Sequence, residues 1–285
     1  MKYEAVIIDL DGTLLNDNDE ICFTNSEAIQ HALRHGYKVT LASGRPHDLM
    51  MPHVEQLQLT ESIICCNGAY QYDPLKNEIL MEHGLPQAAT ASLLNLLNEG
   101  HFDFTLYCKR GVFAQKVSKH IMSLKEKARK LDVALPINIV PSLSNLMAEA
   151  GSIYKVLVSS QDKVALCQLR DALETQFSKD TFQADLSTPT KLDITSSFAT
   201  KGNAAGKWLE QQNINSNNAI AFGDGDNDSS LFHLVGEPVA MANASPSLKG
   251  LANLIVTNNN GCGIGQYLRL VVEEGQHVYQ PTFNY

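Results

Sequence analysis

The stretch Ala5-Val6-Ile7-Ile8-Asp9-Leu10-Asp11-Gly12-Thr13-Leu14-Leu15 contains the features that decide the fold. Its first half is a short, continuous apolar run rich in β-branched residues, which is typical of a strand buried on both faces in a parallel sheet. Ligands of a doubly wound α/β sheet bind outside the carboxyl ends of its strands. The stretch therefore predicts that Asp9 and Asp11 leave the sheet at its ligand-binding edge.

Strand and helix patterns alternate around this stretch. Residues 24–27 have the spacing of a capping box, and the helix that they begin is predicted to end at Gly36. The alternation predicts an α/β core with a doubly wound, Rossmann-like parallel sheet. Strand-like runs lie at 37–42, 62–66, 219–222, 238–241 and 254–257, and helix-like segments lie at 47–57, 228–235 and 246–251.

A second α/β module is predicted inside this core. We expect a core made of residues 1–82 and 188–285 and an inserted α/β cap domain made of residues 83–187. Residues 276–285 match no helix or strand expected for either unit. The helical patterns of the insert lie at 88–98, 116–131 and 163–177, and its strand-like runs lie at 102–107, 153–159 and 182–186.

Composition excludes several classes of function. The 285 residues include 22 Lys and Arg against 31 Asp and Glu, which gives a net charge of −9. Such a charge disfavours nucleic acid and anionic membranes as partners, and it favours a small metabolite. If that metabolite is phosphorylated, local positive groups or a bound cation must draw it in. The oligomeric state stays open between a monomer and a homodimer.

The cysteines and the N-terminus predict a cytoplasmic protein. The six cysteines form no C-x-x-C pair and have no ligand-like spacing with histidine, so we expect reduced thiols and no disulfide framework. The first residues contain Lys2, Glu4 and only a short apolar run, so neither a signal peptide nor a membrane span is expected.

Asp9 and Asp11 suit phosphoryl transfer. One carboxylate can attack phosphorus to form an aspartyl-phosphate, while a second one two residues later can protonate the leaving oxygen and then deprotonate a water. A divalent cation is needed to reduce the repulsion between Asp9 and an anionic phosphate. This chemistry predicts a further carboxylate elsewhere in the chain.

Three further polar clusters also follow predicted strands or begin a helix. Residues 223–228, Gly-Asp-Gly-Asp-Asn-Asp, offer oxygen ligands that suit Mg²⁺, although a solvated turn has the same composition. Ser43 and Gly44 can bind a phosphate oxygen, or Ser43 can cap a helix. Lys201 can neutralise a phosphoryl group, although most lysines at helix starts are solvated.

These motifs, in this order, resemble the four signatures of the haloacid dehalogenase (HAD) superfamily, in particular its Cof-type branch (subclass IIB) of sugar-phosphate phosphatases. The resemblance covers nearly the whole chain and extends to residues 66–69, 192–195 and 239–244. The signatures are matched by Asp9-x-Asp11-Gly12-Thr13-Leu14-Leu15, by Ser43-Gly44-Arg45, by Lys201-Gly202 and by Gly223-Asp224-Gly225-Asp226-Asn227-Asp228.

The resemblance implies a role for each matched residue. It makes Asp9 the nucleophile, Asp11 the general acid and base, and Ser43, Gly44 and Lys201 the phosphate-binding residues. Arg45, Asn67 and Asn227 are weaker candidates for substrate contact. The implied Mg²⁺ ligands are Asp9, the backbone carbonyl of Asp11, Asp224 and, in support, Asn227 and Asp228.

Several readings stay open at this point. A phospho-ligand sensor with weak or no turnover and, less favoured, a phosphomutase are alternatives to a phosphatase. Hexose phosphates, pyridoxal phosphate and flavin mononucleotide are all possible substrates. Tyr107, Lys109 and Arg110 could reach a substrate or lie in a solvated loop. The nine histidines have no metal spacing and are interpreted as surface or packing residues.

Overall fold

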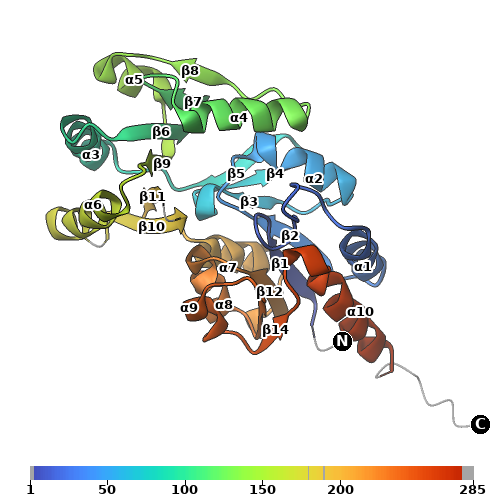
Figure 1. Cartoon of the computed structure of the whole chain (residues 1–285). Coiled ribbons are helices and arrows are strands. Elements are labelled where there is room, and N and C mark those ends of the chain that lie inside the picture. Colours follow the sequence, from blue (N-terminus) through green and yellow to red (C-terminus); the bar gives the residue numbers. More distant parts are fainter. Residues whose placement is uncertain (1–2, 179, 189, 278–285) are drawn as a thin grey trace, which may run out of the picture.

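The computed structural model describes residues 3–178, 180–188 and 190–277, with side chains of the last helix described as far as Glu273. Two sheets, each with its own helices, form two layered units (Figure 1). The predicted α/β core with an inserted α/β module is confirmed. Most of the predicted tail, from residue 278 onward, lies outside the described residues.

The first sheet has eight strands, and six of them are parallel. Two antiparallel strands, β4 (Tyr70–Asp73) and β5 (Glu78–Glu82), extend one edge, because a tight turn at 66–69 reverses the chain after β3. The alternation in the sequence did not predict this pair. In spatial order the parallel strands are β14 (Leu254–Val256), β13 (Glu237–Met241), β12 (Ala219–Gly223), β1 (Ala5–Asp9), β2 (Lys38–Ala42) and β3 (Ile63–Cys65).

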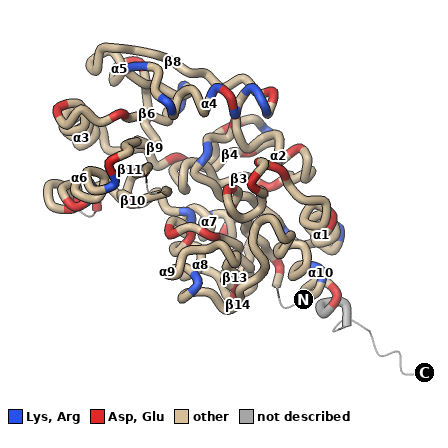
Figure 2. The backbone as a smooth tube through the Cα atoms, in the orientation of Figure 1, with Lys and Arg blue, Asp and Glu red and all other residues tan. Residues whose placement is uncertain are grey.

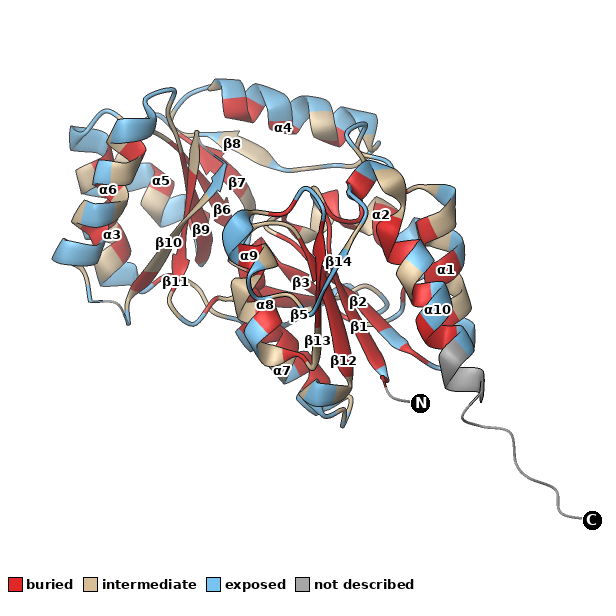
Figure 3. Ribbon diagram, turned by 60° about the horizontal axis from the view of Figure 1, so that its bottom comes forward, coloured by how far each residue is buried: buried red, intermediate tan, exposed pale blue. Residues whose placement is uncertain are grey.

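Helices cover both faces of this sheet, and the buried strands lie between them (Figure 3). Val6 and Ile8 pack into one apolar cluster, while Ala5 and Ile7 pack into another around Trp208. This double burial explains why β1 is apolar without alternation. The first face carries α1 (Phe23–Arg34), α2 (Met51–Gln56) and α10 (Gly263–His277); the second carries α7 (Lys201–Gln211), α8 (Ser229–Leu234) and α9 (Pro246–Lys249).

A disulfide joins Cys22, the residue that caps α1, to Cys262, which directly precedes α10. The two Cα atoms are 6.3 Å apart because α1 and α10 pack side by side. The prediction of reduced thiols is therefore wrong for this pair, and the capping box predicted at 24–27 is replaced by a cap at Cys22, one residue before the helix starts. The free cysteines are Cys65, Cys66, Cys108 and Cys167.

The second sheet has six strands, and all its neighbouring pairs but one are antiparallel. One of its faces packs against α3 (Gln87–Glu99), α5 (Leu143–Ala150) and α6 (Lys163–Gln176). The other face is turned toward the first sheet, with α4 (Lys119–Lys130) beside it. In spatial order its strands are β10 (Phe182–Thr188), β11 (Lys191–Ser196), β9 (Ile153–Ser159), β6 (Asp103–Cys108), β7 (Gly111–Ala114) and β8 (Ile137–Ile139).

The second sheet extends further along the chain than the sequence indicated. The expected boundary at 187/188 lies inside β10, and β11 hydrogen-bonds to both β9 and β10. Thr188 and residues 191–196, expected in the core, therefore belong to the sheet of the insert, because a strand has the same pattern in either sheet. The connections between the units are residues 83–86 and 197–200. None of the described helices is long and apolar enough to cross a membrane.

Candidate active site

The carboxyl ends of three neighbouring strands bring the predicted residues together. Asp9 is the last residue of β1, Ser43 follows β2, and Asp224 follows β12. Because β12, β1 and β2 are adjacent and parallel, the loops after them meet at one edge of the sheet. Carboxylate oxygens of Asp9, Asp224 and Asp228 all lie within 4.8 Å of one another. The sequence placed these acids correctly at one edge.

Lys201 is the cation buried within this acidic cluster. It is the first residue of α7, and its Nζ lies 2.6 Å from Oδ1 of Asp9 and 2.6 Å from Oδ1 of Asp228. Burial raises the pKa of Asp9, Lys201 opposes this rise, and the charges of Asp228 and Asp224 add to it. Two carboxylates thus contact one ammonium group, and a third, Asp224, lies within 4.8 Å of both carboxylates, so acidic groups outnumber the lysine at this place.

Hydrogen bonds hold two of the three acids in the loop after β12, Asp224 and Asp228. Oδ2 of Asp228 accepts hydrogen bonds from the backbone N–H groups of Asp224 and Gly225, each at 3.0 Å, and the Thr13 hydroxyl donates to Asp224 Oδ1 at 3.0 Å. Burial, followed by the charge of Asp228, raises the pKa of Asp224 to about 6. Gly12 has a φ of 78°, and a Cβ there would lie 2.4 Å from Asp224 Oδ2, so only glycine permits this approach.

The side chain of Asp11 lies apart from this cluster and is held by cations. Arg45 donates to both of its carboxylate oxygens, with Nε 2.8 Å from Oδ2, and also donates to Oδ1 of Asp19 at 2.9 Å. Lys127 of α4 lies 3.0 Å from the same Asp19 oxygen and 3.5 Å from Asp11. Although burial opposes the shift, Arg45 holds the pKa of Asp11 well below its usual range. Asp11 is therefore an ionised link between the core and α4 of the insert.

A second polar chain links the loops of the core to the other sheet. Asn227 donates to Asn67 Oδ1 at 3.0 Å, and Asn67 in turn donates to Asp193 Oδ2 at 3.1 Å. Lys155 of β9 lies 3.2 Å from the same Asp193 oxygen and donates to the Gly44 carbonyl at 2.7 Å. The amide nitrogen of Asn227 is thus directed toward Asn67, and the loop containing Gly44 is anchored by a lysine of the insert.

Both chains border one hollow of about 310 Å³. Ser43 lies in its wall, and the Ser43 hydroxyl accepts a hydrogen bond from the Arg45 backbone N–H at 3.1 Å instead of capping a helix. Apart from Tyr107, the sequence did not identify the residues of the insert that line this hollow; a lysine in the middle of the apolar strand at 153–159 was the one signal for Lys155. The lining residues from the insert include Tyr107, His120, Ser123, Lys127, Lys155, Ser187, Thr188 and Lys191.

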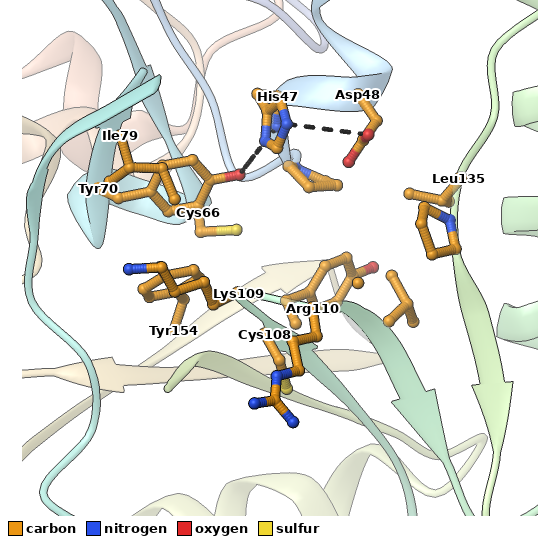
Figure 4. A pocket seen from close by; sticks show the side chains of 15 residues that line it. His47, Asp48, Cys66, Tyr70, Ile79, Cys108, Lys109, Arg110, Leu135 and Tyr154 are labelled. Carbon is orange, nitrogen blue, oxygen red and sulfur yellow. Dashed lines mark hydrogen bonds and ion pairs between the residues drawn. The ribbon is translucent and has the colours of Figure 1, made fainter. Parts of the chain in front are cut away.

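Figure 4 shows a neighbouring hollow of about 230 Å³. Lys109 and Arg110 line this hollow and do not line the one that contains Asp9, whereas Tyr107 borders both. Lys109 lies 3.2 Å from Glu82, and the labelled rings of Tyr70 and Tyr154 stand at one side. Of the three residues that the sequence offered as further substrate contacts, the structure brings only Tyr107 to the acidic cluster's hollow.

Comparison with known proteins agrees with this geometry. The pyridoxal phosphate phosphatase YbhA of Escherichia coli is 27% identical over 270 residues, which cover 94% of this chain and 98% of that protein. A haloacid dehalogenase-like hydrolase from Bacillus subtilis has a TM-score of 0.84 at 23% identity, covering 93% of this chain and 99% of that one. The HAD subclass IIB sugar phosphatase BT4131 has a TM-score of 0.80 at 18% identity, covering 94% and 98%.

A sequence model of one protein family matches almost the whole described chain. The model of haloacid dehalogenase-like hydrolases matches residues 6–268, a span that includes both sheets and every residue of the acidic cluster. The chain therefore belongs to the haloacid dehalogenase-like hydrolase family, and by its kinship with these proteins it is a phosphatase.

Proposed function

We propose that this phosphatase hydrolyses a small phosphomonoester, such as a sugar phosphate or a similar metabolite, through an aspartyl-phosphate formed on Asp9. The observation that carries the proposal is the position of Asp9. It ends a central strand, borders a hollow of about 310 Å³ and contacts a buried lysine at 2.6 Å. A carboxylate placed in this way can reach a phosphorus atom while a fixed positive charge lies beside it.

Magnesium is the cofactor that we propose. Three carboxylates within 4.8 Å of one another offer oxygen ligands. They repel one another, and the single lysine beside them balances only part of their charge, so a divalent cation would balance the rest. Asp9, Asp224 and Asp228 would hold the ion, together with the backbone carbonyl of Asp11. When bound, Mg²⁺ supplies charge neutralisation and orientation for the phosphoryl group. We propose a supporting role for Asn227, whose amide nitrogen already binds Asn67.

The protein's own residues perform two displacements in this proposal. An oxygen of Asp9 bonds to phosphorus while the bond from phosphorus to the leaving oxygen breaks, and protonated Asp11 gives that oxygen its proton. Asp11, now ionised, then takes a proton from a water as the water oxygen bonds to phosphorus and the bond to Asp9 breaks. Both steps require Asp11 to leave Arg45, because that pair keeps the carboxyl ionised and turned away from the cluster.

Three residues are proposed to hold the phosphoryl group. The buried Ser43 hydroxyl and the backbone at Gly44 border the hollow from the side opposite Asp224, and Lys201 supplies the fixed charge. The insert is proposed to act as a cap over this site and to select the leaving group. Relatives named for pyridoxal phosphate and for sugar phosphates support a phosphorylated metabolite, and we further propose that the protein works in the cytoplasm.

The decisive test compares phosphate release by the wild type and by Asp9→Asn. An aryl phosphate and a panel of hexose phosphates, pyridoxal phosphate and flavin mononucleotide would be assayed with Mg²⁺ and with a chelator. We expect release that needs Mg²⁺ and falls by at least about a thousandfold in the variant. Equal inactivity of both proteins, combined with binding of sugar phosphates, would favour the sensor instead.

A further inference from the structure

Three lysines of the insert line the hollow that contains Asp9, and they differ in their partners. Lys127 is paired with Asp19 at 3.0 Å, and Lys155 is paired with Asp193 at 3.2 Å. Lys191 borders the same hollow, yet among the residues that the structure describes no hydrogen bond or ion pair is found for its ammonium group. One lysine beside the catalytic residues therefore has no hydrogen-bond or ion-pair partner among the described residues, although the charges of Asp193 and Asp11 act on it.

The position of Lys191 follows from the register of its strand. Leu192 and Ile194 of β11 are buried against the helices on the outer face of the sheet, so Lys191 and Asp193 point to the inner face, toward the core. Lys191 is only partly exposed, and this burial lowers its pKa. Partial burial of an unpaired ammonium group is unfavourable, so an anion bound beside it would be stabilised.

His120 offers a second unused group at the same place. It is 9% exposed, and its Nε2 lies 2.8 Å from the Tyr107 hydroxyl, while its buried Nδ1 has no partner among the described residues. Burial and the nearby charge of Lys191 lower its pKa to about 3, so the ring is neutral. If the Tyr107 hydroxyl donates to Nε2, the proton is on Nδ1, which is then a buried donor without an acceptor among the described residues.

Lys191 and His120 lie between the hollow that contains Asp9 and a second hollow beside it. His120, Ser123 and Lys191 line both the hollow of about 310 Å³ and an adjoining hollow of about 410 Å³, which is edged mainly by hydroxyl, amide and lysine side chains. The carboxylate of Asp103 in this second lining is already paired with Lys116 at 2.6 Å. Figure 2 shows further basic residues along α4, the helix that carries His120. This junction therefore favours anions despite the overall net charge of −9.

We propose that Lys191 and His120 form a subsite for a second acidic group of the substrate, so that the enzyme prefers phosphomonoesters that carry a further carboxylate or phosphate. The inference rests on the proposed function, because it places the phosphate to be cleaved at Asp9. Lys191 supplies the charge and His120 a directed hydrogen bond. Phosphorylated sugars without a second anion would leave both groups unpaired.

Matched substrates test this preference. We expect the wild type to hydrolyse 6-phosphogluconate and fructose 1,6-bisphosphate at least tenfold more efficiently, in kcat/KM, than glucose 6-phosphate and fructose 6-phosphate. The first pair tests a carboxylate and the second a phosphate as the additional anion. In Lys191→Met the ratio should fall toward one, mainly through a higher KM for the doubly acidic substrate; Lys191→Arg should retain part of it.

Lys163→Met, which changes an exposed lysine on α6 of the insert, is the matched control and should keep the wild-type ratio. A wild-type ratio near one for both pairs, or an unchanged ratio in Lys191→Met, overturns the subsite. Failure of the catalytic proposal would look different, because no substrate, aryl phosphate included, would release phosphate. In that case calorimetric titration of 6-phosphogluconate and glucose 6-phosphate into Asp9→Asn and Asp9→Asn/Lys191→Met still decides between the two outcomes for the subsite.

Discussion

The two sheets of this enzyme use their side chains in different ways. The core sheet is buried on both faces, and its functional groups lie in loops beyond the carboxyl ends of its strands. The sheet of the insert has three helices on one face and α4 beside the other, and Lys155 and Asp193 lie within strands on that other face. A parallel sheet that is buried on both faces can place functional side chains only in the loops at its edge. A sheet with one partly open face can also place them on that face.

The largest effect should come from the core, at Lys201. In Lys201→Met, Asp9 and Asp228 lose the charge that both contact at 2.6 Å, so phosphate release should fall about a thousandfold. Removing one partner of a buried charge pair should also lower the free energy of unfolding by roughly 3 kcal/mol. Activity assays and urea unfolding measure the two effects. Lys207→Met, on an exposed position of the same helix, should change neither; comparable losses in both variants would contradict the special role of Lys201.

An intermediate effect is expected in the insert, at Lys155. Lys155→Met removes the link to the Gly44 carbonyl and leaves the buried Asp193 carboxylate without its cation, which should reduce kcat/KM roughly tenfold to a hundredfold. The unpaired carboxylate should also cost roughly 2 kcal/mol of stability. The double variant Lys155→Met/Asp193→Asn should recover stability but not activity. Recovery of neither would mean that the link to Gly44, and not the charge, determines stability.

The smallest effect concerns stability at low pH and comes from His53 in the core. Burial lowers its pKa from 6.5 to about 4, so the unfolded chain binds a proton at a higher pH than the folded one does. The contribution of His53 to stability is therefore greatest above pH 6.5 and falls as the pH decreases toward 4, by about 2 kcal/mol at pH 5. Urea unfolding of His53→Gln should show a smaller loss between pH 7 and pH 5 than the wild type. Parallel losses in both proteins would exclude His53 as the source.

The same contrast explains what the sequence could predict. Ser43 and Asp224 stand next to glycines at strand ends, and Asp9 ends a strand three residues before Gly12; this local pattern indicates both the loop and its chemistry. Lys155 and Lys191 occupy ordinary alternating positions of strands, and only the pairing of β9 with β11 places them beside the core loops. The residues of β11 were expected in the core because no strand was predicted there, although β11 pairs with its neighbour β10 and with the more distant β9. The disulfide likewise depends on the packing of α1 against α10.

Two connections, residues 83–86 and 197–200, join the insert to the core. A body held at two points can rotate only about the line between them, so any rotation of the insert relative to the core would be about this one axis. The second connection ends at Thr200, and Lys201 follows directly. Gly68 packs against this junction, where a Cβ would lie 2.2 Å from the Thr200 carbonyl oxygen. The axis of such a rotation would therefore pass close to Lys201, so rotation of the insert could change the position of Lys201 relative to Asp9.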